Sequence, residues 1–173
     1  AWGDDAGNHF EIYWMGFLAS GEYSWSSKSP ESSDQYWAKY IRRFFGPNTT
    51  DLYPAFYNLS KRVDFWNTAF MKRGMKNRRN YQLKPLPGIE NPPEGESWTE
   101  YYSSVAETAG SEKEKCVEAL GILASNMDKV TYNRHNLEVF ESIGNLMNKH
   151  CDLVMAVGEI AQNCDNALKA DEE

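Results

Sequence analysis

The chain has 173 residues, a formal net charge of −7 and 41% hydrophobic residues. This length suits one domain, or one and a fraction, and the hydrophobic content excludes wholesale disorder. No apolar run approaches the roughly 18 to 20 residues of a membrane-spanning helix, so we expect no membrane span. The acidic balance argues against nucleic acid as a partner.

Helical periodicity dominates the first 70 residues, which hold 18 of the 24 aromatic side chains. A helix with an aromatic face is predicted from residue 9 to about residue 20, and Ser20-Gly21 together with the stretch from Ser24 to Ser29 is predicted to end it. The next helix starts at Ser29-Pro30-Glu31, a capping pattern, and stops at Gly46-Pro47. A third starts at Thr50-Asp51 and carries an apolar face as far as Phe70.

The second half is predicted to begin with an irregular loop at residues 72–97, which is rich in basic residues, proline and glycine. A short helix follows over residues 98–109 and ends at Gly110. Ser111, with Glu114 three residues later, predicts the cap of a new helix. The last helix is predicted from about Asn133 to Leu168. The expected fold is all-α, a helical bundle of about five helices with one long irregular loop.

The three cysteines are too few for a disulfide scaffold. Cys151 and Cys164 fall thirteen residues apart on one predicted helix, too far to bridge. Cys116 would reach one of them only by chance, so we interpret all three as small core thiols. The histidines His9, His135 and His150 are scattered, and no metal site or cofactor is expected.

The most suggestive run is Trp2-Gly3-Asp4-Asp5. An indole face packs on a pyranose ring, and carboxylates accept hydrogen bonds from adjacent hydroxyls. The run is therefore a candidate sugar site; the alternative is a terminal loop with a partly buried tryptophan. Adjacent residues rarely hold two carboxyls on opposite sides of a sugar, so Asp4 and Asp5 are assigned to binding rather than to acid–base chemistry.

Two further features have a functional and a structural interpretation. The basic residues between 72 and 84 suit an anionic polymer, or a solvated loop that balances an acidic chain. The aromatic stripes at 10–18, 36–45 and 56–70 are interpreted as core rather than as ligand-binding surfaces.

The order of motifs resembles the end of a glycoside hydrolase. Trp2-Gly3-Asp4-Asp5 is followed by a helix ending in Glu22-Tyr23-Ser24-Trp25, and then by a segment from Tyr36-Trp37 to Arg42-Arg43-Phe44-Phe45-Gly46. This order is similar to the family 20 β-N-acetylhexosaminidases, in the branch with a helical C-terminal domain. The likeness covers most of residues 1–70 and, weakly, residues 130–168.

The resemblance implies a parent enzyme with a (β/α)₈ barrel that removes terminal N-acetylhexosamine with help from the substrate's acetamido group. Its catalytic Asp-Glu pair has no counterpart here, so no catalytic residue is expected in this chain. By position, Trp2 would line the sugar subsite, and Asp4, Asp5 and more weakly His9 would contact the sugar. The chain begins at Ala1 and is interpreted as a processed form or a fragment, with the parent secreted or periplasmic.

On this hypothesis residues 1–71 form the aromatic-rich end of the barrel region, residues 72–97 a loop, and residues 98–173 a C-terminal helical domain. The helices would brace the barrel, and exposed aromatic side chains would mark the covered face. Such a face would also let the chain form a homodimer. The alternative is an autonomous helical module that binds a carbohydrate or a protein partner, and a compact monomer with all aromatics buried would favour it.

Overall fold

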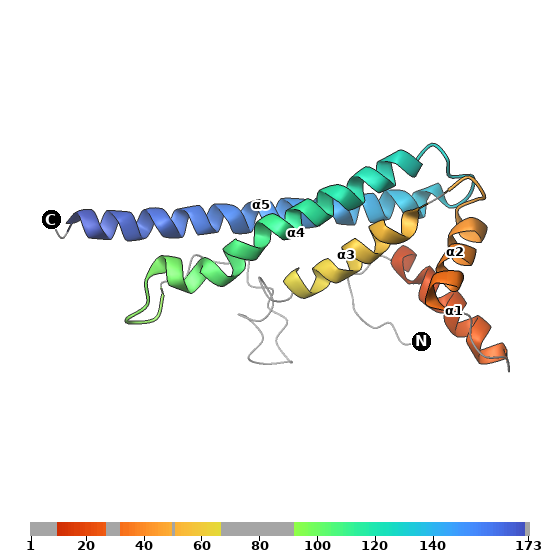
Figure 1. Cartoon of the computed structure of the whole chain (residues 1–173), viewed down its shortest axis with the longest axis horizontal. Helices are drawn as coiled ribbons and strands as arrows, with labels where there is room; N and C mark the ends of the chain where they lie inside the picture. Colours follow the sequence, from red (N-terminus) through yellow and green to blue (C-terminus); the bar gives the residue numbers. More distant parts are fainter. Residues whose placement is uncertain (1–9, 27–31, 50, 67–91, 172–173) are drawn as a thin grey trace. The chain divides into compact units, whose positions relative to one another are not determined.

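The computed structural model describes residues 10–26, 32–49, 51–66 and 92–171 (Figure 1). Within them a 3₁₀ helix at Phe10–Tyr13 precedes five α-helices: α1 (Trp14–Trp25), α2 (Ser33–Phe44), α3 (Leu52–Trp66), α4 (Trp98–Asn126) and α5 (Arg134–Asp171). This part of the chain contains no strand. The predicted all-α class is therefore confirmed.

The chain divides into two compact units, and each unit is built from two separate stretches of sequence. Unit 1 comprises residues 1–57 and 118–144, and unit 2 comprises residues 58–117 and 145–173. Helices α3, α4 and α5 each contribute residues to both units. The predicted segments 1–71, 72–97 and 98–173 stay a prediction, because residues 67–91 lie outside the described residues.

The first helix does not end at about residue 20 but at Trp25, inside the predicted stop from Ser24 to Ser29. Helix α1 continues through Gly21 to Trp25, and the Ser26 N–H donates to the Glu22 carbonyl at 3.0 Å. One glycine inside a helix costs about 1 kcal/mol, which a twelve-residue helix tolerates. Ser20-Gly21 is therefore too weak a signal to end it.

A capping box starts the second helix. Ser32 is the N-cap: its Oγ accepts from the Gln35 N–H at 3.3 Å, and the Gln35 side chain accepts from the Ser32 N–H at 3.2 Å. The predicted start at residues 29–31 lies outside the described residues. The predicted stop is confirmed, since α2 ends at Phe44 and Gly46 takes a φ of 117°.

Helix α3 starts at Leu52, as predicted from Thr50-Asp51, with Pro54 in its first turn. Its predicted extension to Phe70 lies outside the described residues. The long final helix is confirmed as α5, which begins at Arg134 directly after Asn133, a residue with a positive φ of 55°.

The predicted break at Gly110 is wrong. Helix α4 runs unbroken for 29 residues, from Trp98 to Asn126. The Ser111 hydroxyl does not cap a new helix; it donates to the Thr108 carbonyl one turn earlier, at 3.0 Å. Ala109 and Cys116, on either side of the expected break, are both fully buried. Their packing outweighs the small helix penalty of glycine.

Unit 1 has an aromatic core. The rings of Phe56 and Phe140 lie 4.5 Å apart, and Phe45 stacks on Phe56 at 5.9 Å. In the same unit, Phe45, Leu52, Leu123 and Leu137 are fully buried. The apolar stripes predicted for α2 and for the start of α3 therefore form core, as expected.

The connection between α4 and α5, residues 127–133, caps the carboxyl end of α2 within unit 1. The Thr131 and Tyr132 N–H groups donate to the Phe45 carbonyl at 2.8 and 3.2 Å, and the Asn133 side chain donates to the Phe44 carbonyl at 2.7 Å. These bonds satisfy carbonyls that the end of a helix leaves without a partner. The same bonds hold Thr131 of the connection close to Gly46.

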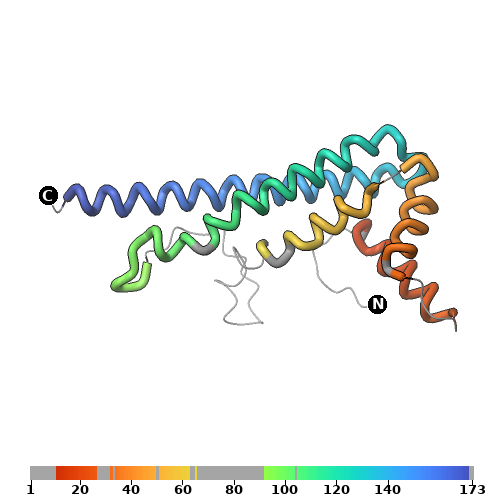
Figure 2. The backbone as a smooth tube through the Cα atoms, in the orientation of Figure 1, coloured from red at the N-terminus to blue at the C-terminus, as the bar shows by residue number. Residues whose placement is uncertain are grey.

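In unit 2, α4 and α5 pair antiparallel (Figure 2). Four contacts define their register: Trp98 with Asp165, Ala106 with Gly158, Ala109 with Val154, and Lys113 with Asp152. Each step forward along α4 is thus matched by a similar step backward along α5. The interface between α4 and α5 contains the small residues Ala106, Ala109 and Gly158, which let the two backbones approach closely.

Candidate functional site

The residues predicted to bind sugar, Trp2, Asp4, Asp5 and His9, lie outside the described residues, as does the basic run at 72–84. The sugar site therefore stays a prediction. Among the helices that the structure describes, α1 carries the candidate functional surface.

Helix α1 is the most apolar helix by sequence, yet it contains no buried residue. Trp25 is 94% exposed, Leu18 46%, Tyr23 39% and Trp14 36%. The prediction that the stripe at 10–18 is core is therefore wrong for α1, because none of the side chains of this helix is fully buried. An apolar helix left uncovered usually marks an interaction surface.

Three of these side chains fall on one face, which we call the α1 stripe: Trp14, Leu18 and Trp25. At about 100° per residue they lie within roughly 40° of one another around the helix axis. Gly21 falls on the same face and adds no side chain. The stripe is thus a narrow apolar ridge about three turns long, the geometry with which a helix packs into a groove.

Contacts with α2 hold α1 in place within unit 1 (Figure 1). Tyr23, on the side opposite the stripe, packs on Tyr36 with ring centroids 5.4 Å apart. Trp14, at the start of the stripe, contacts Phe44 at 6.4 Å. The ends of α1 are therefore anchored to α2, which gives the stripe a fixed backbone.

The stripe carries no charge of its own. Glu22 is the one acidic residue in α1, which has no basic residue, and Glu22 forms an ion pair with Lys39 of α2. A partner of α1 would then meet aromatic and aliphatic surface rather than charge. This composition suits a protein surface better than an anionic polymer.

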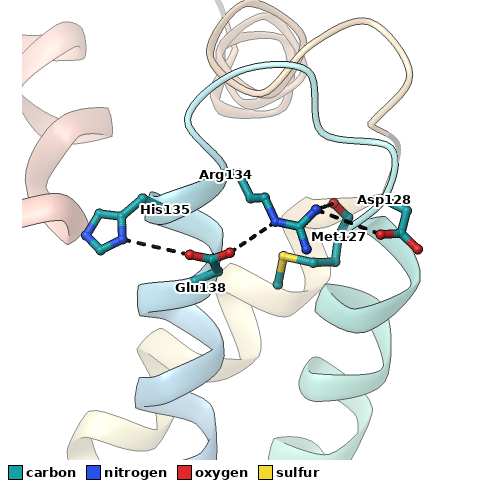
Figure 3. A network of polar contacts seen from close by, with 5 residues as sticks. All are labelled: Met127, Asp128, Arg134, His135 and Glu138. Atoms are coloured by element: carbon teal, nitrogen blue, oxygen red, sulfur yellow. Dashed lines mark hydrogen bonds and ion pairs between the residues drawn. The ribbon is translucent and has the colours of Figure 1, made fainter.

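A polar network lies at the connection between α4 and α5 (Figure 3). Arg134 Nε donates to Glu138 at 3.0 Å, its Nη1 donates to the Met127 carbonyl at 3.3 Å, and Asp128 lies 3.8 Å away. His135 contacts the other oxygen of Glu138 at 3.9 Å. These side chains are exposed and pair with one another across the turn, where such surface ion pairs contribute little to stability.

A shallow hollow in unit 2 lies beside the start of α4. There Asp165 of α5 accepts from the Trp98 and Thr99 N–H groups at 2.9 and 2.8 Å. Hydrogen bonds from the Thr99 side chain and from these two amides lower the pKa of the Asp165 carboxyl. Asp165 thus caps α4 from a second helix, and the positive end of α4 is already occupied by an anion.

The interior of unit 2 holds ionisable groups. Arg62 and Glu112 form an ion pair, and both side chains are largely buried. Cys116 and Cys151 are buried beside this pair. Burial lowers the pKa of His150 to about 4, and its ring lies 5.6 Å from that of Phe65. Of the three cysteines predicted to be core thiols, Cys164 is only half-buried.

The described ranges contain no group of three or more His, Cys, Asp or Glu side chains arranged to hold a metal ion. None of the helices in these ranges combines the length and apolarity needed to cross a bilayer. Comparisons with protein-family models, with curated proteins and with solved structures found no match.

Proposed function

We propose that this chain is the helical C-terminal part of a glycoside hydrolase similar to the family 20 β-N-acetylhexosaminidases. In this role the helices brace the catalytic barrel, and Trp2, Asp4 and Asp5 contribute to the sugar subsite. The catalytic Asp-Glu pair would be supplied by the barrel, so this chain is a structural and binding part of the enzyme rather than its catalytic centre.

The observation that carries the proposal is the α1 stripe. By the resemblance, Trp2-Gly3-Asp4-Asp5 would end a strand of the barrel directly before α1, and a helix in that position would pack its apolar side against the barrel. Trp25 at 94% exposure is unusual for an indole on a finished surface and ordinary for one that a partner covers. The lack of charge along the stripe suits the apolar outer surface of a barrel.

The alternative, an autonomous helical module, predicts that the aromatic side chains are buried inside a compact monomer. The exposure of Trp14, Tyr23 and Trp25 argues against it. A module that captured a different protein would use the same stripe, and the sugar experiment below separates these two roles.

The test is a titration of the chain with N-acetylglucosamine, followed by tryptophan fluorescence and thermal unfolding. We expect saturable binding in the millimolar range, typical of a half-built sugar subsite, and loss of binding in Trp2→Ala. Asp4→Asn and Asp5→Asn should weaken binding at least several-fold, because each loses charge-assisted hydrogen bonds to hydroxyls.

Trp25→Ala is the matched control, since it removes an exposed indole that lies on the stripe rather than in the sugar run. It should bind the sugar as the parent chain does. Sucrose at equal concentration controls for effects on the solvent. Binding that survives Trp2→Ala, or no binding up to high millimolar sugar, would count against the sugar subsite and leave a partner-binding helical module as the better explanation.

A further inference from the structure

Two triplets in the sequence have the pattern Asn-x-Ser/Thr that marks acceptors of N-linked glycans: Asn48-Thr49-Thr50 and Asn58-Leu59-Ser60. Neither has proline in its middle position, which would exclude it. Triplets of this kind also arise by chance, and the pattern alone ranks the two equally. The structure ranks them differently, because it describes both asparagines and places them in unlike surroundings.

Asn48 lies in a tight turn that follows α2. Residues 46–49 form this turn, and the Thr49 N–H donates to the Gly46 carbonyl at 3.3 Å. Proline in the second position of such a turn presets the backbone, and Pro47 stands there; asparagine suits the third position, where Asn48 stands. The local sequence therefore favours a turn with Asn48 near its apex.

The turn is anchored at both ends and exposed in its middle. Thr49 is 2% exposed, and its Oγ1 donates to the Gly46 carbonyl at 2.7 Å. Phe45, before the turn, is fully buried. Pro47 and Asn48, between these anchors, are exposed. A group attached to the Asn48 side chain would therefore extend from the surface and displace no buried side chain.

Asn58 has different surroundings. It lies in the middle of α3 and is half-buried, and Leu59 beside it is 3% exposed. Ser60, the hydroxyl residue of this triplet, belongs to the same helix. An N-linked glycan is bulky and suits a surface loop, whereas at a half-buried helix position it would push packed neighbours apart.

We propose that Asn48 accepts an N-linked glycan when the chain is exported through the endoplasmic reticulum, and that Asn58 does not. The donor is a lipid-linked oligosaccharide. The Asn48 Nδ2 forms a bond to C1 of the first sugar, and the bond between C1 and the lipid pyrophosphate breaks. The pyrophosphate leaves with the electron pair, and the amide proton passes to a base of the transferring enzyme, so the reaction needs no further reagent.

This inference goes beyond the proposed function, which concerns a sugar that the chain binds rather than one that is attached to it. It agrees with the prediction that the parent protein is secreted, because N-linked glycans belong to secreted proteins. The glycan and the sugar subsite are measured separately. A failed titration with N-acetylglucosamine would leave the glycosylation of Asn48 untouched.

The experiment expresses the whole chain behind a cleavable signal peptide in cultured mammalian cells and recovers it from cells and medium. Peptide:N-glycosidase then releases the glycan and converts its asparagine to aspartate. We expect one glycan, seen as a single shift in gel mobility, and a peptide map that locates the conversion at Asn48 alone.

Substitutions in the two triplets provide matched controls. Asn48→Gln should abolish the mobility shift because it replaces the acceptor, and Thr50→Ala should do the same because it removes the hydroxyl that the pattern requires. Thr50→Ser keeps a hydroxyl and should keep the glycan. Ser60→Ala removes the hydroxyl of the other triplet and should leave the shift as it is.

A glycan on Asn58, with or without one on Asn48, would overturn the proposal, and so would a chain that carries none. The melting temperatures before and after release of the glycan should agree within about 2 °C, because Asn48 is exposed. A markedly lower value for the glycosylated chain would mean that the turn does not tolerate the glycan, which also contradicts the proposal. Should a variant fail to fold, the peptide map of the unaltered chain still decides between the two asparagines.

Discussion

Gly46 is the residue whose backbone the fold constrains most tightly. Its φ of 117° suits glycine alone, and a Cβ there would lie 2.6 Å from the Thr131 Oγ1 and 3.2 Å from the Thr131 nitrogen. We expect Gly46→Ala to lower the free energy of unfolding by about 3 kcal/mol, from backbone strain plus overlap. Urea denaturation measures it.

Gly95→Ala separates the two causes. Gly95 also has a positive φ, 92°, but a Cβ there would meet nothing within 4 Å. It should lose about 1 to 2 kcal/mol from strain alone. If the two substitutions cost the same, the close approach of Thr131 to Gly46 contributes nothing and the explanation is wrong.

The buried His150 makes the free energy of unfolding depend on pH. Its pKa in the folded chain is about 4, below the ordinary value of about 6.5, because burial disfavours the charged ring. The unfolded chain therefore binds this proton first as the pH falls. The stability that neutral His150 provides is complete above about pH 6.5 and is lost between pH 6.5 and 4, by up to about 3 kcal/mol.

Urea denaturation at steps of pH measures this fall. His150→Gln should flatten the slope between pH 6.5 and 4, whatever its effect on stability at neutral pH. His135→Gln is the control, because the His135 side chain is 72% exposed, and it should keep the slope of the parent chain. An unchanged slope in His150→Gln would show that other groups cause the acid sensitivity.

At the scale of the element, α4 shows that a single glycine in a helical pattern need not end the helix. Gly110 lies within the helix, and a Cβ there would meet nothing within 4 Å. Gly110→Ala should therefore stabilise the chain by about 0.5 to 1 kcal/mol and raise the melting temperature by roughly 2 to 4 °C. A lower melting temperature would mean that the chain breaks at Gly110 after all.

The helices were predictable where an amphipathic pattern and strong stop signals coincide. Gly46-Pro47 ends α2, and the long spacing of α5 is confirmed. The single signals at Ser20-Gly21 and at Gly110 did not end a helix, because one glycine costs only about 1 kcal/mol. At Gly110 the packing of Ala109 and Cys116 also outweighs that cost. The contact of Trp98 with Asp165 depends on a register between two helices, which no local pattern in the sequence contains.

At the scale of the whole molecule, the α1 stripe predicts weak self-association. Stable interfaces bury about 1,200 to 2,000 Å², and three side chains supply only part of that area. We therefore expect a dimer that forms only at high concentration and is lost in the double variant Leu18→Ser/Trp25→Ser. Analytical ultracentrifugation across a concentration series measures it.

Leu146→Ser is the matched control, because Leu146 is 59% exposed on α5 and lies away from α1 in sequence. It should leave the concentration dependence as it is. If Leu146→Ser abolishes the dimer and the α1 variant does not, the exposed surface that matters is not the stripe. The sequence indicated that exposed aromatics would mark a covered face, but only the structure shows that α1 carries them.

Because each unit is built from two separate stretches of sequence, neither can fold fully while the chain is still being synthesised. Unit 1 needs residues 118–144, and unit 2 needs residues 145–173, so neither is complete when the ribosome has finished α3. The first half of the protein must wait for the last two helices before its core closes. A premature stop codon anywhere before residue 118 removes the second stretch of both units at once. The protein therefore cannot be shortened by one unit at a time.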